Sequence, residues 1–104
     1  MMSELPLRDR IEEVLHTIYD PELPVDIFEL GLIYKIQMME NNGVHIYMTL
    51  TAPACPAAGE IMGEVETKVK ALEGVGDVEV RLTFDPPWDR DMMSDEAKLE
   101  MGFM

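Results

Sequence analysis

The amino-acid sequence predicts an α/β (α+β) fold with the element order α-β-β-α-β. The predicted architecture has two layers, with a small three-stranded sheet, two helices on one face and a short C-terminal helical tail. Two observations predict this order. Apolar residues recur at helical spacing in two segments, and three other segments alternate between apolar and polar residues as strands do. Because no repeat, low-complexity tract or linker divides the chain, residues 1–104 are expected to form a single domain.

The first helix is predicted from an apolar stripe that ends before a helix-breaking dipeptide. Ser3 can cap this helix, and Pro6 is tolerated in its opening turn. The Asp20-Pro21 pair should end it. The stripe consists of Leu7, Ile11, Val14, Leu15 and Ile18. From Asp20 to Gly31 a loop mixes carboxylates with apolar residues, so we expect it to be pinned against the body of the protein.

Three strands are predicted at about residues 32–39, 44–50 and 77–84 from their alternating patterns. The Asn42-Gly43 dipeptide is typical of a tight hairpin turn between the first two strands. The residues expected to face the helices are Leu32, Tyr34, Ile36 and Met38 in the first strand, Val44, Ile46, Met48 and Leu50 in the second, and Val78, Val80, Leu82 and Phe84 in the third.

The remaining elements are a second helix and a short helical tail. The second helix should begin at Pro56 and end near Gly74, a residue that suits a left-handed cap. Ser94 can cap the last helix, which should close at Gly102. The third strand runs parallel to the second, and the pattern leaves open whether it pairs with the second or the first strand.

The charge balance argues against nucleic acid and membranes as partners. The chain has 21 acidic and 8 basic residues, for a formal net charge of −13. A surface this acidic repels phosphate backbones and anionic lipids, although an acidic excess also serves solubility. We expect no signal peptide, and one cysteine cannot form an internal disulfide, so we expect a cytoplasmic protein.

The stretch from Thr51 to Gly59 joins the second strand to the second helix and contains the only cysteine, Cys55. Pro56 suits a first helical turn, which places Cys55 at or beside the N-cap. There the free amide groups and the helix dipole favour an anion, so the thiol should ionise more readily than a free one. The alternative is that Cys55 is a small buried apolar residue at a corner between strand and helix.

The predicted topology brings the 20–31 loop, the Cys55 corner and the segment at Trp88 to one end of the sheet. A thiol beside carboxylates, a threonine and an aromatic lid is a candidate site. A thiol enzyme needs a base against the sulfur, and the sequence places neither His16 nor His45 to act as one. One cysteine with scattered carboxylates is a weak match to a zinc site. Since an iron–sulfur cluster takes about four cysteine ligands, this chain can supply only one thiolate to a shared cluster.

Motifs along nearly the whole chain occur in the order and spacing of a known family. They are Asp20-Pro21-Glu22, Glu29-Leu30-Gly31-Leu32-Ile33-Tyr34, Thr51-x-x-x-Cys55-Pro56, Phe84-x-Pro86-Pro87-Trp88 and Met93-Ser94-x-Glu96-Ala97-Lys98-Leu99. Through these motifs the chain resembles the SufT/PaaD-like family of iron–sulfur cluster assembly proteins. The tail motif points to the SufT-like branch rather than to the phenylacetate-pathway branch.

The resemblance implies an accessory factor for assembling iron–sulfur clusters or delivering them to recipient proteins, and no catalytic turnover of a small metabolite. The family's functional cysteine corresponds to Cys55, as a transient ligand or contact point. The motif threonine and acidic residues correspond to Thr51, Asp20 and Glu22. The implied cofactor is a transient iron–sulfur cluster, shared with a partner or with the second subunit of a homodimer. The implied partners are iron–sulfur assembly proteins and recipient apo-proteins.

Each of these residues also has a structural alternative. Thr51 would then be an ordinary strand-end residue, and Asp20 and Glu22 would be turn residues rather than a dock for a basic partner. Glu29 stands where many relatives have Asp, and its longer side chain still permits a structural hydrogen bond. Trp88 is expected to pack on the core as a lid. The alternative function is an adaptor without metal, which docks cluster donors and recipients while Cys55 is structural.

Overall fold

β2 (Val44–Met48) is the central strand of a three-stranded sheet in the computed structural model, which describes residues 6–19, 24–50 and 58–102. Val44, Ile46 and Met48 are fully buried, because the alternation of the strand turns all three toward the helices. The other helices and strands are α1 (Leu7–Leu15), β1 (Ile33–Met38), α2 (Ala58–Lys70), β3 (Val78–Leu82) and α3 (Asp95–Glu100). The predicted element order and fold class are confirmed.

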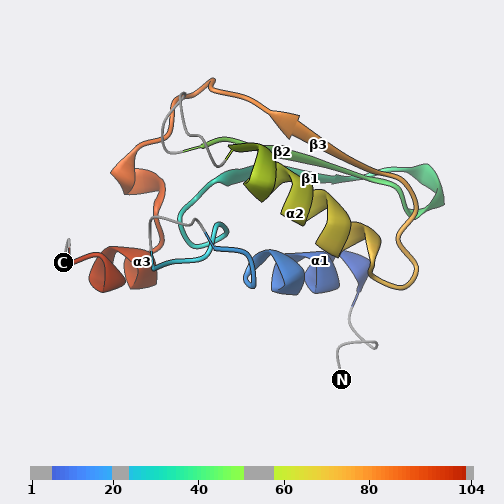
Figure 1. Ribbon diagram of the computed structural model, residues 1–104, viewed down its shortest axis with the longest axis horizontal. Helices are drawn as coiled ribbons and strands as arrows, with labels where there is room; N and C mark the ends of the chain where they lie inside the picture. The colour runs from blue at the N-terminus through green and yellow to red at the C-terminus, as the bar shows by residue number, and fades with distance from the viewer. Residues whose placement is uncertain (1–5, 20–23, 51–57, 103–104) are drawn as a thin grey trace.

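The sheet has the order β1-β2-β3, in which β1 and β2 are antiparallel and β2 and β3 are parallel. This pairing answers the question that the sequence left open. Helices α1 and α2 lie on the same side of the sheet, and α3 lies at the end opposite the hairpin (Figure 1). The core between the layers includes Ile11, Leu15, Ile18, Leu32, Ile36, Ile46, Val65 and Val69.

Helix α1 ends at Leu15, so the prediction that it continues to residue 20 is wrong. The hydroxyl of Thr17 donates to the carbonyl oxygen of Val14 at 2.6 Å, a local bond that competes with continued helix. The carbonyl oxygen of Ile18 then accepts from the amide of Ile27 at 2.8 Å. The chain beyond the helix therefore pairs with the loop that follows, and this brings the end of α1 beside that loop.

A β-bulge between Ile33 and Lys35 changes the predicted faces of β1. Ile33 pairs with Met48 on the helix side of the sheet, whereas Lys35 pairs with Tyr47 on the other side. Tyr34 is the extra residue of the bulge, so its predicted place in a regular inward row is wrong. The bulge turns Tyr34 toward the C-terminal segment, with which it makes a hydrogen bond described below.

The hairpin turn is one residue earlier than the sequence predicts. Asn41 and Asn42 have φ values of 59° and 61°, whereas Gly43 has a φ of −69°. The amide of Gly43 donates to the carbonyl oxygen of Glu40 at 3.2 Å and closes the turn. Two central residues with positive φ match the twist of a hairpin. Asparagine adopts a positive φ more readily than most other residues that have a side chain.

The edge strands are less buried at their ends than the alternation predicts. Leu82 and Phe84, expected to face inward, are each 39 % exposed, and Met38 is 37 % exposed. β1 and β3 form the two edges of the sheet, so no further strand covers their outer sides in the described part of the chain.

The predicted caps of the last helix are confirmed, but Gly74 does not cap α2. Gly102, with a φ of +79°, directly follows the C-cap Met101 of α3, whereas α2 ends at Lys70 and Gly74, with a φ of +91°, lies in the turn beyond it. The hydroxyl of Ser94 accepts from the amide of Ala97 at 3.1 Å, as an N-cap does. The predicted cap Ser3 lies outside the described residues. Among the helices that are described, none has the length and apolar character needed to cross a membrane.

Candidate functional site

The end of the sheet opposite the hairpin brings together the 24–32 loop, the end of α1 and the segment from residue 84 to α3. The predicted site residues Glu29 and Trp88 lie there. Outside the described residues are Cys55, Thr51, Asp20 and Glu22. The roles of these four residues therefore stay predictions, as does the position of the Cys55 corner.

Asp26 is the most interconnected residue of the loop. It is 9 % exposed, and its Oδ2 accepts from the amides of Phe28 and Glu29, each at 3.1 Å. Its carbonyl oxygen accepts from the amide of Leu30 at 3.0 Å. Asp26 thus acts as the N-cap of a single helical turn, which stabilises a segment that has no longer helix or strand of its own.

The sequence contains a signal for this turn, although the sequence analysis did not single out Asp26. Asp26 and Glu29 are three positions apart, which is the spacing of a capping box. In this motif the side chain of the first residue accepts from the backbone amide of the second. The amide of Glu29 makes the expected bond to Asp26. Sequence reasoning missed the residue because any of the loop's carboxylates can cap a turn.

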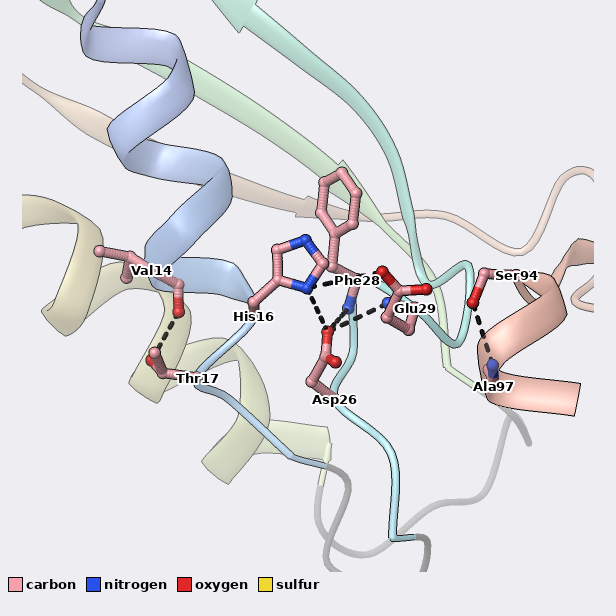
Figure 2. Close-up of polar contacts among 8 residues, drawn as sticks. All are labelled: Val14, His16, Thr17, Asp26, Phe28, Glu29, Ser94 and Ala97. Carbon is pink, nitrogen blue, oxygen red and sulfur yellow. Dashed lines mark hydrogen bonds and ion pairs between the residues drawn. The ribbon is translucent and has the colours of Figure 1, made fainter. Parts of the chain in front are cut away.

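His16 meets the same carboxylates from the end of α1. Its Nδ1 lies 3.1 Å from Oδ2 of Asp26 and 3.7 Å from Oε1 of Glu29. Its ring packs against Phe28, with 4.5 Å between the ring centroids and a tilt of 42°. Figure 2 shows the imidazole between Phe28 and the two carboxylates. His16 therefore fixes the orientation of Asp26 and Glu29 from outside the loop.

Glu29 is half-buried and connects the loop to the C-terminal segment. Its side chain faces His16, while its carbonyl oxygen accepts from the amide of Ser94 at 2.9 Å. The longer side chain at this position thus has a polar partner in the fold. Since the same residue also lies on an open groove, its carboxylate is not withdrawn into the core.

Trp88 is packed on the core, and its ring nitrogen is used in the fold. Its Nε1 donates to the carbonyl oxygen of Leu30 at 2.7 Å, and the ring contacts the buried cluster. The hydroxyl of Tyr34, which lies in β1, donates to the carbonyl oxygen of Pro86 at 2.7 Å. These two bonds hold residues 86–88 across the loop, in agreement with the expectation of a lid.

Gly31 allows the loop and the C-terminal segment to approach closely. It has a φ of +81°, and a Cβ at this position would lie 2.3 Å from the carbonyl oxygen of Met92. Only a residue without a side chain fits both the conformation and the contact. Met93 and Ala97 are buried just beyond this point, so the tail forms part of the folded body.

A groove of about 360 Å³ opens between the loop and α3. Tyr19 and Leu99 are 56 % and 66 % exposed, and both line it. The lining residues are Tyr19, Pro24, Val25, Asp26, Glu29, Glu96, Ala97, Leu99 and Glu100. The groove therefore combines carboxylates with apolar side chains, and it contains no lysine or arginine among its lining residues.

The polar side chains described at this end include the carboxylates of Asp26 and Glu29 and the imidazole of His16. Within residues 6–19, 24–50 and 58–102, no group of three or more His, Cys, Asp or Glu side chains is arranged to hold a metal ion. The carboxylate of Asp26 is oriented by hydrogen bonds, and that of Glu29 lies 3.7 Å from the imidazole Nδ1 of His16. Oriented carboxylates beside exposed apolar side chains can bind a cationic, partly apolar group.

Comparison with known proteins gives consistent matches. A family described as iron–sulfur cluster assembly protein matches residues 8–82. A protein of Porphyromonas gingivalis named "Fe-S protein maturation auxiliary factor" is 48 % identical over 100 residues, which are 96 % of this chain and 95 % of that protein. "Fe-S protein maturation auxiliary factor SufT" of Staphylococcus aureus is 39 % identical and covers 82 % of this chain and 97 % of its own length.

A solved structure also matches. The crystal structure of a DUF59 domain of unknown function from Bacillus anthracis superposes with a TM-score of 0.87 at 36 % sequence identity. The match covers 94 % of this chain and 93 % of that one. The arrangement of α1, the sheet and α2 therefore has a close counterpart in an experimentally determined structure.

Proposed function

The chain belongs to the family of iron–sulfur cluster assembly proteins, and from this premise we propose that it is an accessory factor in the maturation of iron–sulfur proteins. In this proposal it assists the assembly of clusters or their delivery to recipient apo-proteins in the cytoplasm. It does not turn over a small metabolite.

The observation that carries the proposal is the length of the similarity. The relative named as an auxiliary maturation factor is matched over 95 % of its own length, so it has no large additional domain that could perform its function. Nearly the whole of that relative therefore corresponds to this chain. An accessory role also agrees with a described surface whose features suit the binding of another protein.

Cys55 is proposed as the contact point for the cluster. It falls between the end of β2 and the start of α2 in the sequence, and it is the only cysteine of the chain. One thiolate supplies one of the about four ligands that a cluster needs. A cluster held through Cys55 is therefore cargo shared with a second protein or a second subunit, and a single ligand allows it to be released.

A second candidate function is that of an adaptor that binds no metal. The groove beside α3 favours it, because the groove is open and carries carboxylates and exposed apolar residues without any contribution from Cys55. In this version the chain brings donor and recipient proteins together, and Cys55 serves the fold. The two versions differ in whether the thiolate contacts iron.

Anaerobic reconstitution with iron and sulfide distinguishes the two versions. If Cys55 is a ligand, the protein acquires visible thiolate-to-iron absorption that is absent in Cys55→Ser. Ala54→Ser is the matched control, because it changes an unspecified position of the Thr51-x-x-x-Cys55-Pro56 motif and leaves the thiol in place. An equal band in Cys55→Ser excludes the ligand role, and absence of the band in the unaltered protein excludes a cluster shared between two copies of this chain.

The accessory role itself is tested in cells that lack this protein. We expect the activity of enzymes with [4Fe–4S] clusters to fall while the amounts of their polypeptides stay unchanged, and to recover when the gene is restored. Recovery with Cys55→Ser supports the adaptor version, and recovery only with an intact thiol supports the ligand version. Full cluster occupancy in the cells without the protein contradicts both versions.

A further inference from the structure

We propose that the groove between the 24–29 loop and α3 binds a basic amphipathic segment of a partner protein. The inference rests on the proposed function in one respect, since an accessory factor must recognise other proteins. The charges, the exposed side chains and the size of the groove support binding there without a contribution from Cys55.

Helix α3 places two negative charges on the groove that have no positive partner among the described residues. Glu96 and Glu100 both line the groove and are spaced i, i+4, where like charges repel. Glu100 also lies at the C-terminal end of the helix, where the dipole favours a cation. Within the described part of the chain, neither side chain forms an ion pair. Glu96 lies in the first turn of α3, where the dipole favours an anion, so the cost to the fold falls on Glu100 and on the repulsion between the two, and both carboxylates remain available to a cation.

One of the other two carboxylates of the groove is held in a fixed direction. Oδ2 of Asp26 accepts from two backbone amides of the loop and lies 3.1 Å from Nδ1 of His16, whereas the carboxylate of Glu29 lies 3.7 Å from the same nitrogen. Carboxylates that are already ordered lose little conformational entropy when a partner binds them. The loop side of the groove is thus rigid, and the side formed by α3 carries the unpaired charge.

Exposed apolar side chains lie beside these charges. Among the described residues, Leu99 is the most exposed large apolar side chain at 66 %, and Tyr19 is 56 % exposed across the groove. Beneath them lie the buried residues Val25 and Ala97. Apolar residues with a polar rim mark interaction sites rather than ordinary surface.

These features together select the occupant. Negative charges one helical turn apart complement lysine or arginine residues at the same spacing, and the apolar floor accepts a side chain between them. The cavity of about 360 Å³ is at the small end of the range for pockets, so it accepts individual side chains of a segment. A contact of this size gives weak, reversible binding.

The test uses the full chain and a synthetic helical peptide of leucine and lysine, with the two residue types on opposite faces. Fluorescence anisotropy of the labelled peptide at low salt measures the Kd. We expect the double variant Glu96→Gln/Glu100→Gln to raise the Kd about fivefold. The matched control is Glu66→Gln/Glu73→Gln, which removes the same charge from two exposed positions. Glu66 lies in α2 and Glu73 follows it, so the Kd should stay within about twofold.

Leu99→Ala tests the apolar part of the groove and should raise the Kd about tenfold. Met39→Ala is its control, since Met39 is exposed at 40 % but lies at the hairpin end. Circular dichroism establishes that each variant is folded. Equal weakening by the groove and control variants shows general attraction to an acidic protein and overturns the proposal, as does binding that none of the variants affects.

Two further outcomes are decisive. Sedimentation that shows a dimer, lost in Leu99→Ala while the peptide does not bind, identifies a second copy of the chain as the occupant and overturns the proposal. Failure of the peptide to bind overturns the groove proposal but leaves the cellular test of the accessory role intact. Conversely, peptide binding through the groove in a protein whose loss does not affect cluster enzymes supports the groove while excluding the proposed function.

Discussion

At the hairpin end of the sheet, backbone groups make the contacts between segments. The amide of Gly76 donates to the carbonyl oxygen of Asn42, and the amide of Val44 to that of Asp77, both at 2.8 Å. At the opposite end, side chains make many of them. The carboxylate of Asp26 and the ring of Trp88 each hold segments that have little regular secondary structure.

This difference determines what each end tolerates. Contacts between backbone groups depend on local conformation, so most side chains can change as long as the turn is preserved. Contacts made by side chains depend on particular chemical groups. The end opposite the hairpin also carries the groove, and the bonds to Asp26 orient its carboxylate there. The predictions below test whether the two ends differ in this way.

Glycine-to-alanine substitutions should produce the largest effects. Gly31→Ala combines a positive φ of +81° with a contact of 2.3 Å to backbone, so we expect a loss of about 3 kcal/mol or more in the free energy of unfolding. Gly76→Ala at the hairpin end has a contact of 2.5 Å but no φ in the left-handed region, so its loss should be about half as large. Urea denaturation followed by circular dichroism measures both.

Gly63→Ala is the control for these substitutions. It lies in α2, and a Cβ there has nothing within 4 Å. Because alanine restricts the unfolded chain and favours the helix, this variant should be more stable by about 0.5–1 kcal/mol. A Gly31→Ala protein as stable as the unaltered one would show that the loop and the C-terminal segment are not held as closely as described.

Asp26→Ala should have the next largest effect. It removes the acceptor of two backbone amides and of His16 in a nearly buried position, so we expect a loss of about 2 kcal/mol. Glu79→Ala is the contrast, since Glu79 pairs with His45 and Arg81 on an exposed surface, and should cost less than about 0.5 kcal/mol. Equal losses in the two variants would contradict the difference between the two regions.

The elements of the fold could be predicted because each has a local signal. The alternation in Val44–Met48 and the helical spacing of Ile61, Val65 and Val69 are visible within a few residues, and the structure buries these side chains as expected. The caps at Ser94 and Gly102 are similarly local. The features that sequence reasoning missed arise where two local preferences compete.

The end of α1 and the hairpin turn illustrate this competition. The stripe ending at Ile18 predicts a longer helix, but Ile18 is buried after the helix has ended, because the chain pairs with Ile27 instead. Asn42-Gly43 is a strong turn signal, but Asn41 also tolerates a positive φ, so either register is available. The choice depends on how β1 and β2 align along their whole length.

The candidate site could be predicted only in part. The loop and the Trp88 segment meet at one end, as the topology predicts. His16 could not be assigned to this site, because its contact with Asp26 depends on where α1 ends and how the loop returns. The sequence identifies Leu99 only as part of a tail motif, and its exposure depends on how α3 packs against the body, which no local pattern determines.

Tyr34→Phe should have a moderate effect. It removes one hydroxyl that donates to the carbonyl oxygen of Pro86, so we expect a loss of about 1 kcal/mol. Fluorescence of Trp88, the only tryptophan, measures the change close to the altered bond. Tyr47→Phe is the matched control, because the Tyr47 hydroxyl makes no hydrogen bond within the described residues, and its effect should be below about 0.3 kcal/mol. A Tyr34→Phe protein indistinguishable from this control would show that the bond contributes nothing.

Asn42→Gly should have the smallest effect and addresses the hairpin end directly. Glycine adopts the φ of 61° without strain, but it also has more freedom to lose on folding, so the two contributions offset to within about 0.5 kcal/mol. The bond from Gly76 goes to the carbonyl oxygen of residue 42 and is retained in the variant. Asn42→Val keeps the same backbone groups but disfavours a positive φ, so it should cost about 1–2 kcal/mol. If Asn42→Gly is instead as damaging as Asn42→Val, the asparagine side chain itself holds the turn, and the hairpin end resembles the opposite end more than the backbone contacts indicate.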